Sequence, residues 1–203
     1  MAENKVSYGL KNFHFALITE DVQTGVETYH DPIKHPGAVE MKLDPKGEQS
    51  DFYADDSNYF TESSNQGYEG SIVLAVVTEK FRTDVLGEVL DEIDKVLTEM
   101  SNAKIKKVAF LFEFDGDIKA TRHVLYNVSV SRPGINSTTK SDKTEPNTTE
   151  LNFVAAQRQS DSKVKTSTTV DTPAAVYDNW YKKVYEKKVD SAAPSSAPKL
   201  QKA

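Results

Sequence analysis

The sequence predicts a mainly β protein of the α+β class, with antiparallel strands and a few flanking helices. Runs of alternating apolar and polar residues recur along the 203-residue chain, and two of them lie on either side of the turn-forming letters EFDGD at residues 113–117. Helical patterns are confined to segments near residues 78–100 and 172–186. Because side chains alternate between the two faces of a strand, such runs are typical of strands with one buried face.

The first strands are expected at residues 8–19 and 38–44, where apolar and polar side chains alternate. The next run, SIVLAVV at residues 71–77, is apolar on both faces. One face of an antiparallel strand normally meets water, so this strand is expected to be covered by a helix or by a neighbouring chain.

Two helical patterns follow this strand. Thr78 is expected to cap a short helix that ends before Gly87. Residues 88–100 show an apolar stripe at helical spacing and are predicted to form a second helix. The same letters also allow a loop and a short strand at residues 95–100, and this alternative stays open. The inward-facing residues of the two patterns are Phe81, Val85 and Leu86, and Val89, Leu90, Ile93, Val96, Leu97 and Met100.

Residues 44–66 are predicted to form a long ordered loop. The segment is rich in Asp, Ser and Asn and carries the aromatic residues Phe52, Tyr53, Tyr59 and Phe60. It is too aromatic for a disordered linker and too irregular for a strand. Because long loops in compact domains are usually functional or disordered, these aromatic side chains are expected to be buried against the domain or another subunit.

The letters EFDGD fit either a tight turn or a metal site. Asp and Gly dominate tight turns, whereas closely spaced carboxylates can bind a divalent cation. The alternating runs KVAFLFEF and VLYNVSV on either side favour a hairpin with a three-residue loop at 115–117, in which Gly116 takes the left-handed position. An enzyme that holds a metal with Glu113, Asp115 and Asp117 stays open as an alternative. The expected pairs are Phe114 with Ile118, Phe112 with Ala120 and Val108 with Val124.

Two further strands are expected at residues 148–157 and 161–169, followed by a helix that begins at Thr172 and Pro173. Residues 1–188 are predicted to form a single domain. The Pro-, Ser- and Ala-rich residues 189–203 are expected to be a disordered basic tail. The apolar stripe that docks the helix on the sheet consists of Val176, Tyr177, Trp180, Tyr181 and Val184.

Composition limits the function classes. The chain has no cysteine, which removes disulfides and Cys-based zinc sites. Because it lacks a transmembrane-length apolar run and a signal-peptide core, the protein is expected to be made in the cytosol. Residues 51–100 carry three Lys or Arg against twelve Asp or Glu, a net charge of −9, whereas residues 182–203 carry six Lys against two acids, a net charge of +4. An acidic body argues against tight wrapping of DNA.

Catalytic motifs are absent from the sequence. It contains no G-x-S-x-G elbow, phosphate loop or H-E-x-x-H pair. The four histidines, His14, His30, His35 and His123, are expected to be structural or exposed to solvent. We therefore expect a protein with no enzymatic activity, no cofactor and no bound metal, although a site built from distant residues would show no motif.

Four pieces of sequence occur in a characteristic order and spacing: FYAD at 52–55, GYEG at 67–70, FRTDVLGE at 81–88 and LFEFDGDIKATRHVLYN at 111–127. Together with the segments between them, they closely resemble the major tail proteins of long-tailed phages with non-contractile tails. The resemblance covers about residues 7–186. Residues 88–106 depart from the family pattern of a turn and a strand, because they offer a helical stripe.

The resemblance implies a β-sandwich or partial barrel, six copies of which close into a ring, with rings stacked into a tail tube that conducts DNA during ejection. Such a subunit would have no chemistry of its own and would be located in the virion tail. Its partners would be further copies of itself, the tape measure, tail tip and tail terminator proteins, and phage DNA passing without sequence-specific binding. No membrane partner is implied. The lumen of such tubes is typically acidic, which agrees with the acidic body.

Two sets of candidate residues follow from the resemblance. Ring closure pairs sheet edges, so the doubly apolar strand and the aromatic loop are candidates for contacts between subunits or rings. Acidic positions opposite the apolar strand faces are candidates for the channel wall. The contact set is Phe52, Tyr53, Tyr59, Phe60, Ile72, Leu74 and Val76, and the lumen set is Glu40, Asp44, Glu113 and Glu150.

A second hypothesis is a β-sandwich binding module that recognises a carbohydrate or a host surface. Such a module would act as a monomer, whereas a tube subunit would self-assemble. Its candidate stacking residues are Phe52, Tyr53, Tyr59, Tyr68 and Trp180.

Overall fold

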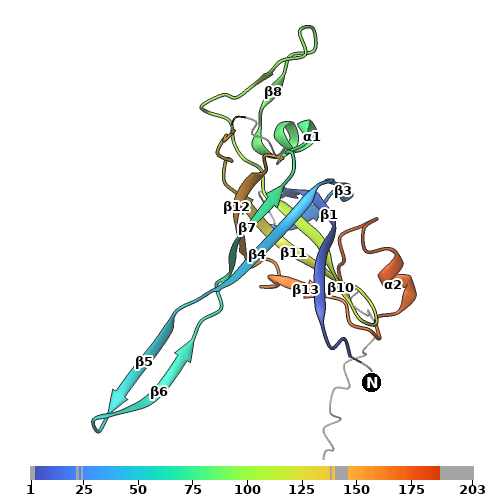
Figure 1. Ribbon diagram of the computed structural model, residues 1–203. Helices are drawn as coiled ribbons and strands as arrows, with labels where there is room; N and C mark the ends of the chain where they lie inside the picture. Colours follow the sequence, from blue (N-terminus) through green and yellow to red (C-terminus); the bar gives the residue numbers. More distant parts are fainter. Residues whose placement is uncertain (1–2, 22, 24, 138, 140–145, 188–203) are drawn as a thin grey trace, which may run out of the picture.

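The computed structural model describes residues 3–21, 23, 25–137, 139 and 146–187, which form a mainly antiparallel β structure with short helical segments (Figure 1). The fold class predicted from the sequence is confirmed. A nine-stranded sheet has the order β2-β1-β10-β11-β12-β7-β4, with β3 pairing β1 and β13 pairing β11. Its strands are β1 (Ser7–Glu20), β2 (Glu27–Tyr29), β3 (Ile33–Lys34), β4 (Ala38–Lys46), β7 (Gly67–Leu74), β10 (Val108–Gly116), β11 (Thr121–Val130), β12 (Thr149–Ala156) and β13 (Lys165–Ser167).

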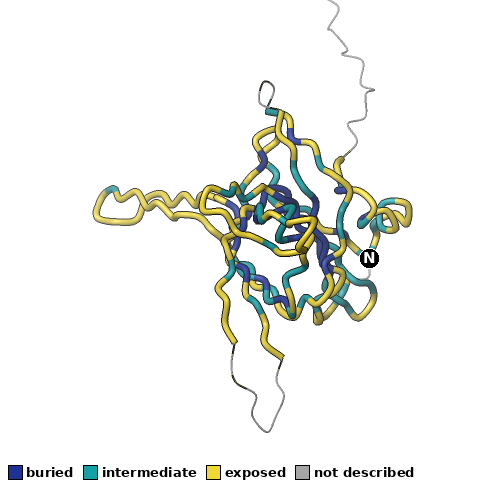
Figure 2. The backbone as a smooth tube through the Cα atoms, turned by 90° about the horizontal axis from the view of Figure 1, so that it is seen from above, coloured by how far each residue is buried: buried dark blue, intermediate teal, exposed yellow. Residues whose placement is uncertain are grey.

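The sheet curls around a first apolar core, so that strands distant in the sheet order meet across it. Phe13 of β1 belongs to the same buried cluster as Ile72 and Leu74 of β7. Phe110 lies between the two sides, with its ring centroid 5.0 Å from Phe13 and 5.3 Å from Phe153, both in edge-to-face contacts. The buried residues are concentrated in this centre (Figure 2), and the curled sheet forms a partial barrel.

A second, smaller core lies on the outer face of β1, β10 and β11, where residues 173–186 fold over the sheet as a C-terminal strap. Trp180 and Val184 of the strap are 2% and 3% exposed, and they pack with Leu111, Val124 and Tyr126. The long helix predicted here is wrong in extent. Only α2 (Ala174–Asp178) is helical, and no side-chain hydrogen bond caps it.

The helix predicted after Thr78 is confirmed. The Phe81 N–H donates to Thr78 Oγ1 at 3.3 Å, and α1 (Glu79–Phe81) continues as a π-helical turn (Arg82–Leu86). Gly87 ends the turn with a φ of 78°, in the left-handed region that favours glycine. Phe81, Val85 and Leu86 are buried in the first core, as predicted.

The hairpin of β10 and β11 is confirmed, but the predicted three-residue loop is wrong. Phe114 pairs with Thr121 rather than with Ile118, and Gly116 ends β10 without a positive φ. The longer turn is built around the side chain of Asn4, which accepts hydrogen bonds from the Ile118 and Lys119 N–H groups, both at 3.1 Å. A Cβ on Gly116 would lie 2.2 Å from Asn4 Nδ2, so glycine is needed here for space.

A bulge in β11 explains why its apolar residues do not share one face. Between the pairs Phe110–Leu125 and Val108–Val128, two residues of β11 oppose the single residue Ala109. The extra residue reverses the alternation. The apolar residues of the run VLYNVSV, which simple alternation would place on one face, therefore divide: Val124 and Tyr126 face the second core, and Val128 and Val130 face the first.

Residues 88–100 form a small hairpin, so the predicted helix is wrong. The alternative prediction of a loop and a short strand agrees better with the structure. β8 (Val89–Leu90) pairs with β9 (Leu97–Thr98) in a projection that we call arm 2, residues 88–106 (Figure 1). The Asp91 carboxylate accepts hydrogen bonds from the N–H groups of Ile93 and Asp94, both at 2.8 Å, which closes a turn instead of a helix. Ile93 of the apolar stripe is 91% exposed.

The segment predicted as an ordered loop is a second projecting hairpin. β5 (Gln49–Ala54) and β6 (Ser57–Ser63) pair beyond the ends of β4 and β7, and we call residues 47–65 arm 1. Asp55 and Asp56 at its tip have φ values of 50° and 56°, as a two-residue hairpin turn requires. Both arms leave the body and are exposed along their length (Figure 2).

His123 of β11 is packed in the sheet, with its ring stacked on Phe112 at a centroid distance of 5.2 Å. Burial, with a smaller contribution from the charge of Lys165, lowers the pKa of His123 to about 4 from an ordinary value of 6.5. As the pH falls through this interval, the unfolded chain takes up a proton before the folded chain does. Stability is therefore lost between pH 6.5 and pH 4.

We expect this histidine to lower the free energy of unfolding by roughly 2 to 3 kcal/mol between pH 7 and pH 4. Urea unfolding at a series of pH values would show the loss, and His123→Leu should reduce it, with a remainder from His14 and His35, whose pKa values burial also lowers. His30→Leu, at an exposed histidine, should keep the wild-type pH dependence. An unchanged acid slope in His123→Leu would contradict this assignment.

Candidate functional site

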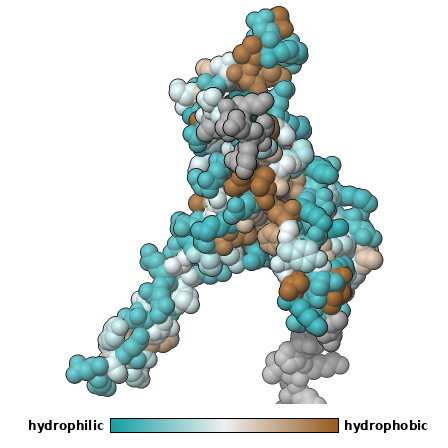
Figure 3. All heavy atoms as spheres, in the orientation of Figure 1, coloured by the Kyte–Doolittle hydropathy of each residue, from teal (hydrophilic) through white to brown (hydrophobic). Residues whose placement is uncertain are grey.

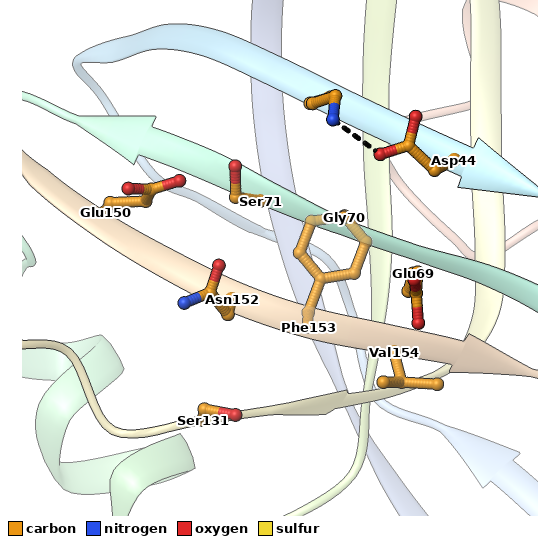
Figure 4. Close-up of a pocket in the computed structure, with 10 residues that line it drawn as sticks. Asp44, Glu69, Gly70, Ser71, Ser131, Glu150, Asn152, Phe153 and Val154 are labelled. Carbon is orange, nitrogen blue, oxygen red and sulfur yellow. Dashed lines mark ion pairs between the residues drawn. The ribbon is translucent and has the colours of Figure 1, made fainter.

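The outer face of β4, β7 and β12 is polar, whereas their inner face belongs to the first core. Alternation along each strand separates the two faces, and the register aligns the outer side chains across the three strands. A shallow hollow of about 420 Å³ lies over this face (Figure 4). The aligned rows are Glu40–Val73–Glu150, Lys42–Ser71–Asn152 and Asp44–Glu69–Val154.

These rows hold four carboxylates against one ammonium group, so the face is acidic. Lys42 Nζ lies 2.8 Å from Asp44 Oδ2 (Figure 4), and the hydrogen bond to this carboxylate raises the pKa of Lys42. Both groups are more than half exposed, so the pair contributes little to stability in water. Asp44 and Glu69 occupy directly opposed positions, and each has an exposed cation nearby, because Lys46 Nζ lies 4.0 Å from Glu69 Oε2. Packing of the core does not require carboxylates at these two positions.

Three of the four predicted lumen residues lie together on this acidic face. Glu40, Asp44 and Glu150 are all exposed there. Glu69, which the sequence interpretation missed, completes the set. Extending the alternation of the apolar run backwards from Ile72 would have placed Glu69 on the outer face, because it lies three residues before a buried position.

Glu113 does not belong to this face, and its assignment to the lumen is corrected. Its side chain is 7% exposed, because the C-terminal strap covers the outer face of β10. Glu113 Oε2 accepts hydrogen bonds from Arg122 Nε at 2.9 Å and from the Tyr181 hydroxyl at 3.1 Å. Glu113 Oε1 accepts one from Asn12 Nδ2 at 2.7 Å. This carboxylate holds the strap to the sheet.

The other carboxylates of EFDGD point to different partners. Asp115 forms an ion pair with Lys11, and Asp117 Oδ1 accepts a hydrogen bond from the Lys5 N–H at 2.8 Å. The structure therefore does not bring Glu113, Asp115 and Asp117 together as a ligand set. Within the described part of the chain, no group of three or more His, Asp or Glu side chains is placed to hold a metal ion.

The histidines contact groups of their own chain. His14 Nδ1 lies 2.7 Å from the Asn12 carbonyl oxygen, and its ring stacks on Tyr181 at a centroid distance of 4.5 Å. His35 Nε2 accepts a hydrogen bond from the Thr78 N–H at 3.1 Å, where it supports the start of α1. The exposed His30 lies 2.8 Å from the Thr19 hydroxyl.

The predicted contact residues fall into two groups. The four aromatic side chains of arm 1 are exposed, from 57% for Phe60 to 73% for Tyr59. Ile72 and Leu74 are fully buried in the first core of the same chain, so their assignment to contacts with a second copy is corrected. β7 is an inner strand of the sheet, and its own domain covers one face. Val76, just beyond β7, is 69% exposed.

The residues proposed for carbohydrate stacking are also separated. Trp180 is 2% exposed beneath the strap, and Tyr68 is half-buried against the first core. Only the aromatic residues on arm 1 remain available to a ligand.

A groove of about 420 Å³ lies at the base of arm 2, and we call it the arm-2 groove. It is bounded by the end of β7, the π-helical turn and the segment 132–136. Apolar side chains gather at the end of arm 2 and again toward the middle of the face shown in Figure 3. The apolar lining includes Val76, Val77, Leu86, Pro133 and Ile135.

Comparisons with known proteins give few matches. No protein-family model matches the sequence, and no curated protein matches it. Among solved structures, the chain is similar to the cap that terminates the tube of the anti-feeding prophage, with 12% sequence identity and a TM-score of 0.46, over 83% of this chain and 97% of that chain. No helix among the described residues is long and apolar enough to span a membrane.

The different surroundings of Glu113 and Glu150 lead to opposite expectations for charge reversal. Glu113→Lys should lower the free energy of unfolding by roughly 3 to 5 kcal/mol, because it removes the counter-charge of Arg122 and places a second cation at a position that is 7% exposed. Glu150→Lys, on the exposed face, should change it by less than about 0.5 kcal/mol. Urea unfolding monitored by tryptophan fluorescence would measure both. Equal effects of the two substitutions would contradict the placement of Glu113 beneath the strap.

Proposed function

We propose that this chain is a structural subunit of a phage tail tube, which self-assembles into stacked hexameric rings that form the conduit for DNA ejection. The observation that carries the proposal is the acidic outer face of β4, β7 and β12. It is exposed, its side chains are aligned in rows, and its three rows hold four carboxylates against one ammonium group. We propose no catalytic activity, cofactor or metal for the chain.

An acidic wall suits a conduit for DNA. Phosphate contacts from Lys and Arg dominate the affinity of proteins for DNA, and here carboxylates outnumber ammonium groups by four to one. With six copies around a channel, the wall would repel phosphates from all sides. DNA would pass through without binding to it.

Arm 1 supports the proposal of self-assembly. A two-stranded hairpin is marginally stable alone in water, and apolar side chains exposed together mark a contact surface. In addition, β4 ends the order of the main sheet and is paired there only with β7. A strand at a sheet edge offers backbone groups to a second copy.

The same proposal defines the surroundings of the subunit. Its partners would be further copies, the tape measure, tail tip and tail terminator proteins, and phage DNA without sequence-specific contacts. It would be made in the host cytoplasm and would be located in the virion tail.

Removal of arm 1 should abolish tubes and leave the domain folded. The Gln66 N–H donates to the Lys46 carbonyl oxygen at 2.8 Å, so a two-residue Asn-Gly turn can replace residues 47–65 between them. We expect negative-stain microscopy to show tubes for the full chain and none for this variant, with unchanged thermal unfolding. As a matched control, replacing only the four aromatic residues of arm 1 with serine should give the same loss. Tubes that persist in both variants would exclude arm 1 as the connector.

Charge reversal on the acidic face tests the conduit itself. In phage that carry Glu40→Lys and Glu150→Lys, tubes should form normally, whereas DNA ejection should slow because the wall now attracts phosphate. Ejection followed by a DNA-binding dye would measure the rate. Asp171→Lys with Asp178→Lys makes the same change of charge at exposed positions, one just before the strap and one within it, and should leave the rate unchanged. An unchanged rate in the first variant would exclude this face as the wall.

The alternative function, a carbohydrate-binding module, has weaker support. The only exposed members of its candidate set are on arm 1, and arm 1 has no neighbouring concave surface among the pockets described above. A glycan array probed with the monomeric protein would test it.

A further inference from the structure

We propose that the arm-2 groove receives an aromatic side chain of arm 1 from a second copy of this chain, so that copies connect head to tail. This inference rests on the proposed function, and it identifies the surface that arm 1 would bind. It follows from the shape and apolar lining of the groove, the exposure of arm 1, the positions of both on the molecule and the partly exposed arginines of the groove.

The groove has the size and lining to hold an aromatic ring. Its volume of about 420 Å³ lies near the lower end of the range of roughly 300 to 1,000 Å³ that is typical of ligand pockets. Val76 and Ile135 on its walls are 69% and 96% exposed, and Leu86 at its base is 4% exposed. Burial of these walls against a ring would remove a large apolar area from water.

Arm 1 presents rings that have no place in their own domain. Phe52 and Phe60 occupy directly opposed positions, so their side chains point to the same face of the arm. A register shift beyond this pair leaves Tyr59 outside the regular pairing, and it is 73% exposed. A tyrosine ring can fill an apolar groove and still direct its hydroxyl to a polar rim.

The two surfaces lie at opposite ends of the molecule. Arm 1 projects from one end of the body, and arm 2, with the groove at its base, projects from the other (Figure 1). A contact between these two different surfaces is heterologous. Repetition of such a contact adds copies in one direction instead of closing a dimer.

Arm 1 is acidic, and the groove offers it two partly exposed arginine side chains. Arm 1 contains no Lys or Arg and carries five acidic residues. The groove is lined by Arg82 and Arg132, whose side chains are 41% and 39% exposed, and by Glu88 and Glu99, which pair with them. Glu88 holds Arg82 in place, with its Oε1 accepting from Arg82 Nε at 3.0 Å. Arginine also binds the faces of aromatic rings. The acidic residues of arm 1 are Glu48, Asp51, Asp55, Asp56 and Glu62.

A second hollow could compete for arm 1. About 810 Å³ lies beside the C-terminal strap, where Val176 and Tyr185 are accompanied by Lys183 and Lys187. It is also partly apolar, and its lining carries two lysines and Glu186. It lies beside α2 on the flank of the body, away from the end that bears arm 2 (Figure 1), so it does not give the same end-to-end direction.

The absence of cysteine from the sequence allows a direct test. The full chain with Tyr59→Cys and Ile135→Cys would be treated with a flexible bismaleimide and separated on a denaturing gel. We expect a ladder of covalent multimers, because each copy carries both halves of a head-to-tail contact. Either single variant should stop at dimers. The pair Tyr59→Cys with Val176→Cys, which reports on the hollow beside the strap, should give no ladder.

Microscopy of the same samples separates this inference from the proposed function. Tubes without a ladder in the Tyr59→Cys and Ile135→Cys variant would overturn the inference and leave the tube function standing. A ladder without rings or tubes would support the contact and count against the function. A ladder from the Tyr59→Cys and Val176→Cys variant alone would move the contact to the strap.

A substitution in the groove gives a second measurement. Ile135 is 96% exposed, so Ile135→Asp should not affect folding. It should raise the protein concentration needed for half-maximal assembly at least about tenfold, as measured by sedimentation velocity, because a charge would enter an apolar contact next to acidic arm 1. Ile118→Asp, at an exposed isoleucine in the β10–β11 turn, should leave assembly unchanged. Equal effects of the two variants would also overturn the inference.

Discussion

The bulge in β11 decides which faces of the curled sheet are covered. Because two residues of β11 oppose Ala109, the apolar side chains before the bulge and those after it pack in different cores. Val124 and Tyr126 reach the outer face, where the strap lies, while Val128 and Val130 turn inward. Beyond the bulge the outer face carries no strap, so β12, β7 and β4 keep only their inner face buried. One irregularity in the backbone thus separates a sealed half of the sheet from an open half.

The two halves treat charge in different ways. On the sealed half, Glu113 has three hydrogen-bond donors and the counter-charge of Arg122, which a buried carboxylate needs. On the open half, Asp44 and Glu69 have only exposed ion-pair partners, Lys42 and Lys46, and water solvates these groups. Charge on the first half fastens two parts of one chain together. The charged side chains on the open half are exposed on the surface of the protein.

The fold was predictable wherever a segment packs on its own core, and unpredictable elsewhere. Alternation identified β1, β4, β10 and β12, and the Thr78 cap and Gly87 identified the helical turn, because local sequence reports these features. The loop after β10 depends on Asn4, which is more than 100 residues away, so no local pattern could reveal it. Arm 1 packs on nothing and therefore lacks the periodic pattern of a strand. Alternation also placed Glu40, Asp44 and Glu150 on an outer face, but it could not show that the strap covers Glu113.

The acidic character of arm 1 has a consequence for the free protein. A hairpin with four exposed aromatic side chains is a hazard in solution, because such segments pair with one another indiscriminately. Two copies that approach arm to arm bring five carboxylates against five, and this repulsion acts before the rings can touch. The five carboxylates of arm 1 thus oppose nonspecific pairing of one arm with another. They favour separate copies of the protein in solution over copies paired arm to arm.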